Sequence, residues 1–493
     1  RELMNNNGRQ THAHRTPESV SPHTAQRTGQ TSAPQRKNSA NTSGRNSGDY
    51  VFRAGDARHQ NTALRAQQRI TSLTPEERKK IQKRERREVE EREREKKWQN
   101  EVVRVRGRID VFMLVIILVL LALGSITVFS ASYPLAVSEG KASNYYIIKQ
   151  LQFVGLGGLL MLLEIFLVPV DFYKKKFVVF TAYFVSMALL IYTFFRGNAQ
   201  GEAVRWVRIG PVNVQPSELM KVSLVLMLAW YADKYRRQMK ELNLGGTSYL
   251  YNIGFPVLIL GGAAGFVLIG KHLSGTIIIG AIAFFMMIIA GCKITWLLET
   301  LIPVGAAGIG LFLLKNPYAL KRITTFTDEN ADKLDELYQT TQSLYAIGSG
   351  GLFGVGLGNS RQKYSYLTQA HTDFIFSIWC EEWGFIGAAG LIILFILFVW
   401  RGYVIAMRAP DKFTMLTAFG ITTHVGLQAF LNMCVASDLI MNTGITLPFF
   451  SYGGSSLVVL MMEMGILLSI SRQYYRKKSD IEREQMMKQL GMD

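Results

Sequence analysis

Long apolar runs repeat along most of this chain and constrain its fold more than any other feature. From about residue 110 to 471 they follow one another at short intervals, each roughly 20 residues long. Because an α-helix rises about 1.5 Å per residue, a run of this length crosses the hydrocarbon core of a bilayer. A soluble domain would not carry such runs repeatedly, so we expect an integral membrane protein.

We predict an all-α membrane domain over residues 109–475 with about ten transmembrane helices. The predicted spans are 110–132, 145–169, 177–195, 215–232, 252–270, 273–291, 294–314, 374–400, 413–436 and 447–471. Most of the connecting segments are short. The segment 315–373 is an exception, and connections of that length are usually functional or disordered. Its glycines and aromatic residues predict an ordered loop folded onto the bundle.

The first 109 residues differ from the rest of the chain. They hold about 25 Lys and Arg against 13 Asp and Glu, hence about +12 of the total formal charge of +18. Residues 1–73 are rich in Ser, Asn, Gln and Arg and are predicted to form a disordered basic tail. Residues 74–108 begin with Thr-Pro-Glu-Glu and continue with charges of both signs, which predicts a charged juxtamembrane helix.

The basic clusters predict the orientation of the chain. With ten spans and a cytoplasmic N-terminus, the positive-inside rule is satisfied by every cluster. The clusters lie at 174–176, 234–237, 293, 401–412 and 472–478. We therefore expect a cytoplasmic C-terminal tail at 476–493 and an outer location for the loop 315–373. The basic tail fits an anchoring role or contact with anionic lipid, and we expect no nucleic-acid partner.

Metal and disulfide chemistry find little support in the sequence. The three cysteines, Cys292, Cys380 and Cys434, lie apart in or beside predicted spans, and no CxxC motif occurs. The seven histidines show no metal-ligand spacing. We predict neither a disulfide framework nor a zinc site.

The stretch 196–221 gathers cations beside a predicted helix start. Arg205, Trp206 and Arg208 precede a Pro-Ser-Glu sequence, and Lys221 follows one turn into the span. One interpretation is an interfacial belt of aromatic and snorkelling basic residues. The other is an anion site, since guanidinium and ammonium groups at a helix N-terminus suit a pyrophosphate. Lys221 and Glu218, three residues apart, could also simply neutralise each other.

A second group of polar residues lies at 370–384. Asp373 immediately precedes a span, where a carboxylate is either a helix cap or a functional group. His371 could orient it or share its charge, or could only contact headgroups. Glu381 and Glu382 fall about two turns deeper, and we favour polar packing over an ion path for them.

The third group is the segment LPFFSYGGSS at 447–456. Gly453 and Gly454 stand between Ser451 and Ser455, so backbone N–H groups could approach a ligand closely. The alternative is a close helix contact through small residues. By the predicted topology all three groups face outward. A carboxylate, several cations and a glycine-rich segment would suit glycosyl transfer from a lipid pyrophosphate, although the pattern by itself indicates only a transporter or a lipid-handling enzyme.

Four motifs resemble those of the SEDS family (shape, elongation, division, sporulation). They are RWVRIGPVNVQPSELMK at 205–221, QSLYAIGSGGLFGVGLGNS at 342–360, AHTDFIFSI at 370–378 and TLPFFSYGGSS at 446–456. They occur in the family's order within 110–475, and the chain is most similar to the division and sporulation members, with the elongation members next. Two departures stand out: Lys271-His272-Leu273-Ser274-Gly275-Thr276 replaces a QPDLGT-like stretch, and the outer loop at 439–444 lacks a common Pro and Lys.

The resemblance implies a peptidoglycan glycosyltransferase in the bacterial cytoplasmic membrane. It would polymerise lipid II at the outer face and work with a class B penicillin-binding protein and other division proteins. Asp373 would be the essential catalytic residue, since it matches the Asp of the HTDF motif. The substrate would be bound by residues of all four motifs: Arg205, Trp206, Arg208, Lys221, Gln342, His371, Ser451, Gly453, Gly454 and Ser455.

Two other functions stay open. The chain could be a flippase that carries lipid II outward, although the sequence shows no convincing repeat and its polar motifs cluster at one face rather than the midplane. It could also be a non-catalytic scaffold for division proteins. No cofactor is predicted with certainty; a divalent cation could assist the pyrophosphate, but no ligand cluster indicates one.

Overall fold

The computed structural model divides the chain into two compact units, residues 1–90 and 91–493. The residues that it describes are 75, 76, 86, 89, 90, 93, 102–196, 198–200, 203–209, 212–240, 249–315, 320, 338–364, 366–442, 444–481 and 486. The predicted disordered tail 1–73 lies outside them. Everything below concerns the second unit.

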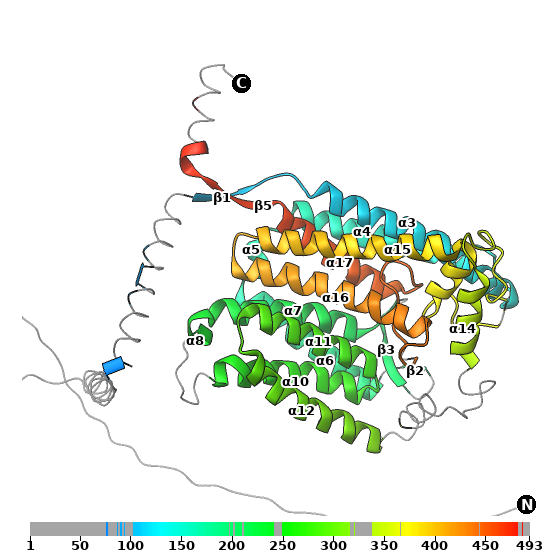
Figure 1. The fold of residues 1–493 in the computed structure, drawn as a ribbon, viewed down its shortest axis with the longest axis horizontal. Helices are drawn as coiled ribbons and strands as arrows, with labels where there is room; N and C mark the ends of the chain where they lie inside the picture. The colour runs from blue at the N-terminus through cyan, green and yellow to red at the C-terminus, as the bar shows by residue number, and fades with distance from the viewer. Residues whose placement is uncertain are drawn as a thin grey trace, which may run out of the picture. The chain divides into compact units, whose positions relative to one another are not determined.

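A bundle of long helices forms the body of the molecule (Figure 1). Its helices are α3 (Val111–Ser138), α4 (Tyr145–Phe166), α6 (Lys176–Arg196), α7 (Pro216–Lys234), α10 (Phe255–Ile269), α11 (Leu273–Ala290), α12 (Ile294–Lys315), α15 (Ile375–Arg408), α16 (Lys412–Ala436) and α17 (Gly454–Ser471). Nine helices of the described residues are long and apolar enough to cross a membrane. The tenth predicted span is α7, which packs against α6, α11 and α16 but carries several charged residues.

Short helices and strands lie at the two ends of the bundle. The helices are α5 (Val170–Tyr173), α8 (Arg236–Lys240), a π-helical turn (Leu250–Gly254) and α14 (Tyr338–Ser349). The strands are β1 (Val102–Arg106), β2 (Asn198–Gln200), β3 (Ala203–Ile209), β4 (Val212–Val214) and β5 (Gln473–Lys477). β1 and β5 pair antiparallel, with Val102 opposite Lys477, and β2, β3 and β4 form an antiparallel sheet in that order.

The strands correct two predictions. The predicted juxtamembrane helix 74–108 ends in strand β1 rather than in helix, although the few residues described between 75 and 93 are helical. The stretch 196–214 was expected to be an outer loop and instead holds β2–β4. A third difference concerns the last span, because 447–453 is irregular and α17 begins only at Gly454.

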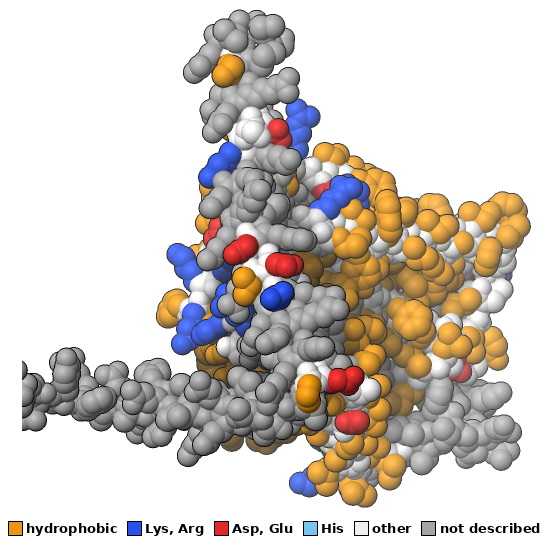
Figure 2. Space-filling view, turned by 60° about the vertical axis from the view of Figure 1, so that its left-hand side comes forward, with side chains coloured by type: hydrophobic (Ala, Val, Ile, Leu, Met, Phe, Trp, Pro, Cys, Tyr) orange, Lys and Arg blue, Asp and Glu red, His pale blue; other side chains and the backbone are white. Residues whose placement is uncertain are grey.

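Apolar side chains cover the outside of the bundle and polar ones are concentrated at its ends. α12 is hardly buried within the bundle, whereas most of α16 and α17 lies inside it. Figure 2 shows hydrophobic side chains over the side of the bundle and charged ones gathered toward one end. An apolar exterior and a packed interior are what a lipid-facing bundle requires. The chain is thus a multi-pass membrane protein.

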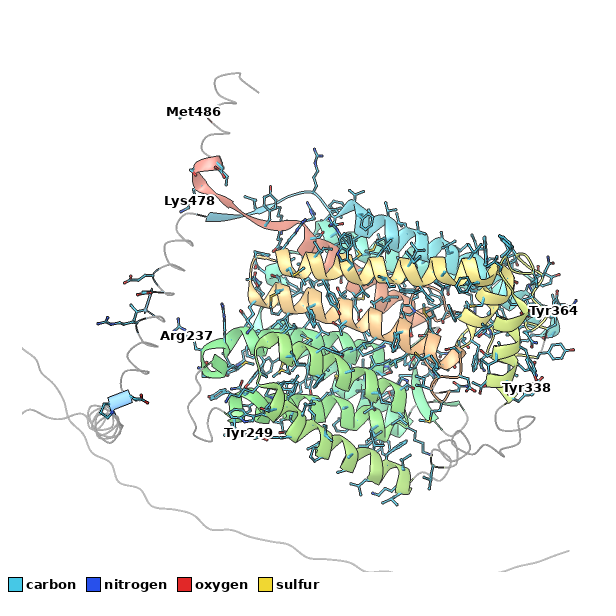
Figure 3. The ribbon with its side chains drawn as sticks, in the orientation of Figure 1. Arg237, Tyr249, Tyr338, Tyr364, Lys478 and Met486 are labelled. Carbon is cyan, nitrogen blue, oxygen red and sulfur yellow. The ribbon has the colours of Figure 1, made fainter. Side chains whose placement is uncertain are left out.

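The two ends of the bundle differ in the sequence segments that they carry. Figure 3 shows Arg237, Tyr249 and Lys478 at one end and Tyr338 and Tyr364 at the other. The first end also holds α5, α8 and the β1–β5 pair, and the second holds α14 and the β2–β4 sheet (Figure 1). Predicted basic clusters thus mark one end and predicted outer motifs the other. Which end faces the cytoplasm stays a prediction.

Charged groups fix helix starts at the basic end. Asp110 caps α3 through Met113 N–H at 2.9 Å and also accepts from Arg401 of α15 at 2.6 Å. Asp411 forms a capping box with Thr414 at the start of α16 and an ion pair with Lys174 at 2.7 Å. These contacts tie helices that are distant in the sequence.

The described part of the predicted outer loop, 338–364 and 366–373, packs onto the start of α15. α15 is broken at Gly384, whose φ of 64° lies in the left-handed region. A Cβ there would lie 2.3 Å from Gly354 N, and one at Gly354 would lie 2.2 Å from Glu382 O. Glycine at both positions therefore allows direct backbone contact. The prediction of an ordered loop is confirmed for these residues.

Glu381 and Glu382 hold this loop by polar packing, as predicted. Glu381 accepts from Arg361 N at 2.8 Å and from Ser360 Oγ. Glu382 forms an almost fully buried ion pair with Lys363 at 2.9 Å, and Ser130 Oγ of α3 bonds to both.

We predict that Lys363→Met destabilises the protein by about 3–5 kcal/mol, because it leaves the Glu382 carboxylate buried without its cation. The midpoint of thermal unfolding in detergent measures the effect. Lys174→Met, which breaks a partly exposed pair, serves as the control and should cost about 1 kcal/mol or less. Equal shifts for the two variants would contradict the prediction.

Candidate active site

The turn that precedes α15 is held through three consecutive backbone carbonyls. The donor–acceptor pairs are Tyr452 N to His371 O (2.9 Å), Ser451 Oγ to Thr372 O (2.6 Å) and Asn432 Nδ2 to Asp373 O (2.8 Å). The donors come from α16 and from the segment that leads into α17. Two of the sequence motifs, 370–378 and 446–456, therefore meet at this turn.

Asp373 is half-buried in this turn. The N-cap residue of α15 is Phe374, without a side-chain hydrogen bond. Asp373 therefore does not occupy the N-cap position. The catalytic role of its carboxylate stays a prediction.

His371 lies between two tyrosine rings. Its ring centroid is 5.4 Å from that of Tyr146 and 5.7 Å from that of Tyr452. Burial lowers the pKa of His371 from 6.5 to about 4, and nearby Glu139 offsets this only in part. His371 is therefore neutral near pH 7 and adds no positive charge to the turn that holds Asp373.

Lys221 lies inside the bundle with a side chain only 3% exposed. Its Nζ is 2.8 Å from Glu218 Oε2 and donates to Gln428 Oε1 of α16 at 2.7 Å. Of the interpretations of Lys221, mutual neutralisation with Glu218 is the one found in this structure.

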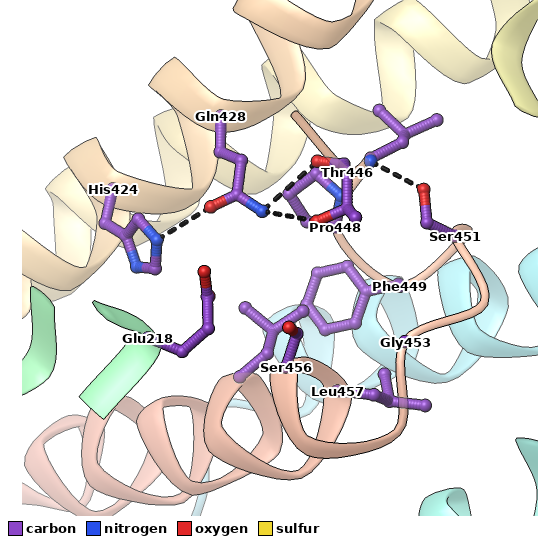
Figure 4. A pocket seen from close by; sticks show the side chains of 12 residues that line it. Glu218, His424, Gln428, Thr446, Pro448, Phe449, Ser451, Gly453, Ser456 and Leu457 are labelled. Carbon is purple, nitrogen blue, oxygen red and sulfur yellow. Dashed lines mark hydrogen bonds between the residues drawn. The ribbon is translucent and has the colours of Figure 1, made fainter. Parts of the chain in front are cut away.

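Glu218 and Gln428 also line a pocket between α7, α16 and the segment before α17 (Figure 4). The remaining lining residues are His424, Thr446, Leu447, Pro448, Phe449, Ser451, Gly453, Ser456, Leu457 and Leu460. Lys221 is not among them, so its charge lies behind the two polar groups that face the pocket.

The residues of the glycine-rich segment 451–455 make different kinds of contact. The Ser451 hydroxyl is engaged by Thr372 O and by Leu447 N–H, at 2.6 and 2.7 Å, so it shapes the turn. A Cβ at Gly454 would lie 2.5 Å from the Phe153 ring, which is the predicted alternative of a close helix contact. A Cβ at Gly453 would make an ordinary contact with Ser456 at 3.7 Å, so the position tolerates a side chain, and Gly453 lines the pocket. Ser455 Oγ accepts from Gln215 N at 3.3 Å.

The bond between Ser455 and Gln215 joins the motif 446–456 to the motif 205–221, because Gln215 lies between β4 and α7. Arg205, Trp206 and Arg208 lie on β3, where Arg208 is exposed and pairs with Asn213 of β4. The side chain of Arg205 lies outside the described residues. Gln342 is half-buried on α14. Its neighbour Ser343 hydrogen-bonds to Ser377 at 2.5 Å and to Ala436 O at 2.6 Å, which fixes α14 against α15 and α16.

Sequence reasoning missed three polar residues around this site. Gln428, His424 and Glu463 are buried within α16 and α17. A polar residue inside an apolar span is the only sequence signal that could have singled them out. In the part of the chain that the structure describes, no group of three His, Cys, Asp or Glu is arranged to hold a metal ion. The three cysteines are buried and free.

Residues 111–476 match the family model FtsW/RodA/SpoVE, described as "Cell cycle protein". The chain belongs to this family. Stage V sporulation protein E of Bacillus subtilis is 36% identical over 74% of this chain and 97% of its own length. A "Probable peptidoglycan glycosyltransferase FtsW" of Geobacter sp. strain M18 is 35% identical over 75% of this chain and 98% of its own length.

Solved structures share the fold of this family member. The rod shape determining protein RodA of Thermus thermophilus matches 74% of this chain and 97% of its own, with a TM-score of 0.54 and 28% identity. A chain from "Structural coordination of polymerization and crosslinking by a peptidoglycan synthase complex" matches 74% of this chain and 98% of its own, with a TM-score of 0.59 and 26% identity.

We predict that His371 makes the folded protein lose stability as the pH falls from about 6.5 to about 4. Its folded pKa is about 4 against an ordinary value of 6.5, so the unfolded chain binds the extra proton in this window. Thermal unfolding measured across this pH range should therefore drop less for His371→Gln than for the wild type. Parallel curves for the two proteins would refute the assignment.

Proposed function

We propose that this chain is a peptidoglycan glycosyltransferase that polymerises lipid II into β-1,4 glycan strands during septal wall synthesis. It would act at the outer face of the bacterial cytoplasmic membrane, with both termini in the cytoplasm. The convergence of three motifs carries the proposal: the Asp373 turn, the glycine-rich segment and the β4–α7 junction are joined by hydrogen bonds at one end of the bundle. The names of several relatives, which read probable peptidoglycan glycosyltransferase, support the same activity.

Asp373 is the general base of the proposed reaction. The donor sugar is α-linked to pyrophosphate and the product is β-linked, so a single displacement inverts the anomeric carbon. The acceptor hydroxyl oxygen forms the new bond, its proton passes to the Asp373 carboxylate, and the bond to the pyrophosphate oxygen breaks. One carboxylate suffices for this step, and no covalent nucleophile is required.

The departing pyrophosphate needs positive charge, and we assign this task to Arg205 and Arg208 of β3. Lys221 is a weaker candidate for direct contact than the sequence indicated, since Glu218 neutralises it behind the pocket. Trp206, Gln342, His371 and the 451–455 segment complete the proposed substrate site. Among them Ser451 and Gly454 act on the shape of the site rather than on the substrate.

A lipid II flippase is the second candidate, and one observation favours it. The sequence placed the polar motifs at one face, but His424 and Glu463 lie near the centres of α16 and α17, and α15 is broken at Gly384. Buried polar groups at mid-membrane and broken helices are features of transporters. These two features weaken the argument against a transporter, although the sequence motifs themselves meet at one end of the bundle.

The proposed partners are those of a polymerase that works with a crosslinking enzyme. One solved structure to which the chain is similar belongs to a complex that coordinates polymerization and crosslinking. A class B penicillin-binding protein is therefore the proposed transpeptidase partner, together with other division proteins. A non-catalytic scaffold would need the same partners but not Asp373.

We predict that Asp373→Ala abolishes glycan polymerisation. Loss of a general base lowers the rate about 10²- to 10⁴-fold. The measurement uses the purified chain with a candidate class B penicillin-binding protein and labelled lipid II, with polymer length resolved on gels. Asp438→Asn, at a second outer carboxylate whose φ of 58° asparagine tolerates, is the matched control and should retain activity.

The outcomes separate the three functions. Polymer from the wild type and the control but not from Asp373→Ala supports the polymerase. Polymer from all three proteins assigns the activity to the partner. No polymer from an intact complex, combined with lipid II translocation in vesicles, favours the flippase, and neither activity favours the scaffold.

Deleting residues 1–70 should leave polymerisation unchanged, because every proposed site residue lies within 205–455. The truncated and full-length proteins are compared in the same assay with equal amounts of partner. Loss of polymer from a truncated protein that still unfolds at the wild-type temperature would assign the tail a role in the chemistry.

A further inference from the structure

A chain of hydrogen bonds continues from the pocket into the middle of the bundle. Lys221 Nζ and His424 Nε2 both lie within bonding distance of Gln428 Oε1, at 2.7 and 3.0 Å. His424 Nδ1 faces the Glu463 carboxylate at 2.9 and 3.0 Å. All four side chains are at least nine-tenths buried. The chain of hydrogen bonds therefore links α7, α16 and α17 inside the bundle.

The orientation of the Gln428 amide is fixed from its other side. Its Nε2 donates to the backbone oxygen and to the hydroxyl of Thr446, both at 3.1 Å (Figure 4). The backbone oxygen can only accept, so the amide nitrogen must face Thr446 and Oε1 must face Lys221 and His424. Since Oε1 cannot donate, His424 Nε2 has to carry the hydrogen of its bond.

The same reasoning places a hydrogen between His424 Nδ1 and Glu463. Nδ1 either is protonated and donates to a carboxylate, or accepts from a protonated Glu463. In both cases the two side chains together carry no net charge. Lys221 and Glu218 also sum to zero, so the four titratable groups meet the requirement for neutrality inside an apolar bundle.

We propose that Gln428, His424 and Glu463 are positioning residues that hold the Lys221–Glu218 ion pair, and with it the polar lining of the pocket, in one arrangement for glycosyl transfer. The proposal rests on the proposed function. If Glu463 is lost, His424 Nδ1 has no partner, so the ring can turn and take Nε2 away from Gln428 Oε1. Outside that bond Nε2 no longer has to carry the hydrogen, and the amide loses one of the donors that hold its Oε1 in place. The amide would then turn, and Lys221 would lose one of its two acceptors.

Steady-state kinetics on Glu463→Leu and Glu463→Gln test the proposal. Glutamine can donate to His424 Nδ1 and should keep the wild-type kcat, whereas leucine should lower kcat about tenfold, equivalent to about 1.4 kcal/mol, with KM for lipid II nearly unchanged. Glu164→Leu is the matched control: Glu164 of α4 is a second buried carboxyl near Glu463, and among the described residues no hydrogen bond joins it to the chain, so kcat should stay at its wild-type value. Thermal unfolding reports whether each variant is folded.

A double variant of Glu463 and Gln428 distinguishes a positioning role of Glu463 from a purely structural one. In a Gln428→Met background, Glu463→Leu should cost no further activity, because its effect passes through the amide. Three results would overturn the proposal. The kcat losses of Gln428→Met and Glu463→Leu could multiply in the double variant, Gln428→Met could keep the wild-type kcat, or Glu164→Leu could lose as much kcat as Glu463→Leu. A wild type that makes no polymer would instead refute the proposed function.

Nitrogen-15 NMR of histidine-labelled protein in lipid tests the arrangement independently of activity, with His424→Asn assigning the signal. We expect a protonated Nε2 in the wild type and in Glu463→Gln, and a partly unprotonated Nε2 in Glu463→Leu. An unprotonated Nε2 in the wild type would overturn the proposal whatever the kinetic result.

Discussion

The absence of water from the bilayer core is the constraint on which this structure depends. Any polar group within the bundle must find its partner within the protein, since lipid offers none. Lys221 meets Glu218 and Gln428, and Lys363 meets Glu382. Each of these contacts also decides where a segment at the motif-bearing end of the bundle lies. The same hydrogen bonds and ion pairs therefore satisfy the buried polar groups and shape the candidate site.

The site depends on backbone groups as much as on side chains. Ser451 and Asn432 bind carbonyls of the 371–373 turn, and glycines let the loop approach α15. Residues of a conspicuous motif thus need not touch the substrate. Ser451, whose hydroxyl is fully engaged, illustrates that a motif can be required for the geometry of the residue beside it, here Asp373.

The sequence predicted the helices well because the length of an apolar run is set by the bilayer. It failed where local backbone pairing decides. β3 was taken for a loop because its arginines lie in a short segment between two spans, although most of its residues are apolar. The last span was extended to 447 because Leu447, Phe449 and Phe450 are apolar, although they form a turn. The contact between Lys221 and Gln428 could not be predicted either, since the two residues lie 207 positions apart and only the packing of α7 on α16 joins them. The pairing of Lys221 with Glu218, three residues apart, was within reach of sequence reasoning and was considered.

The β1–β5 pair gives the membrane domain a common exit for both ends of the chain. Val102 lies opposite Lys477, so the polypeptide that precedes the first span and the one that follows the last span leave from the same point. A protein that binds either terminal segment is thereby tethered within reach of the other. Two weak attachments at such a point raise each other's local concentration, and a partner can be held firmly without any single strong interface.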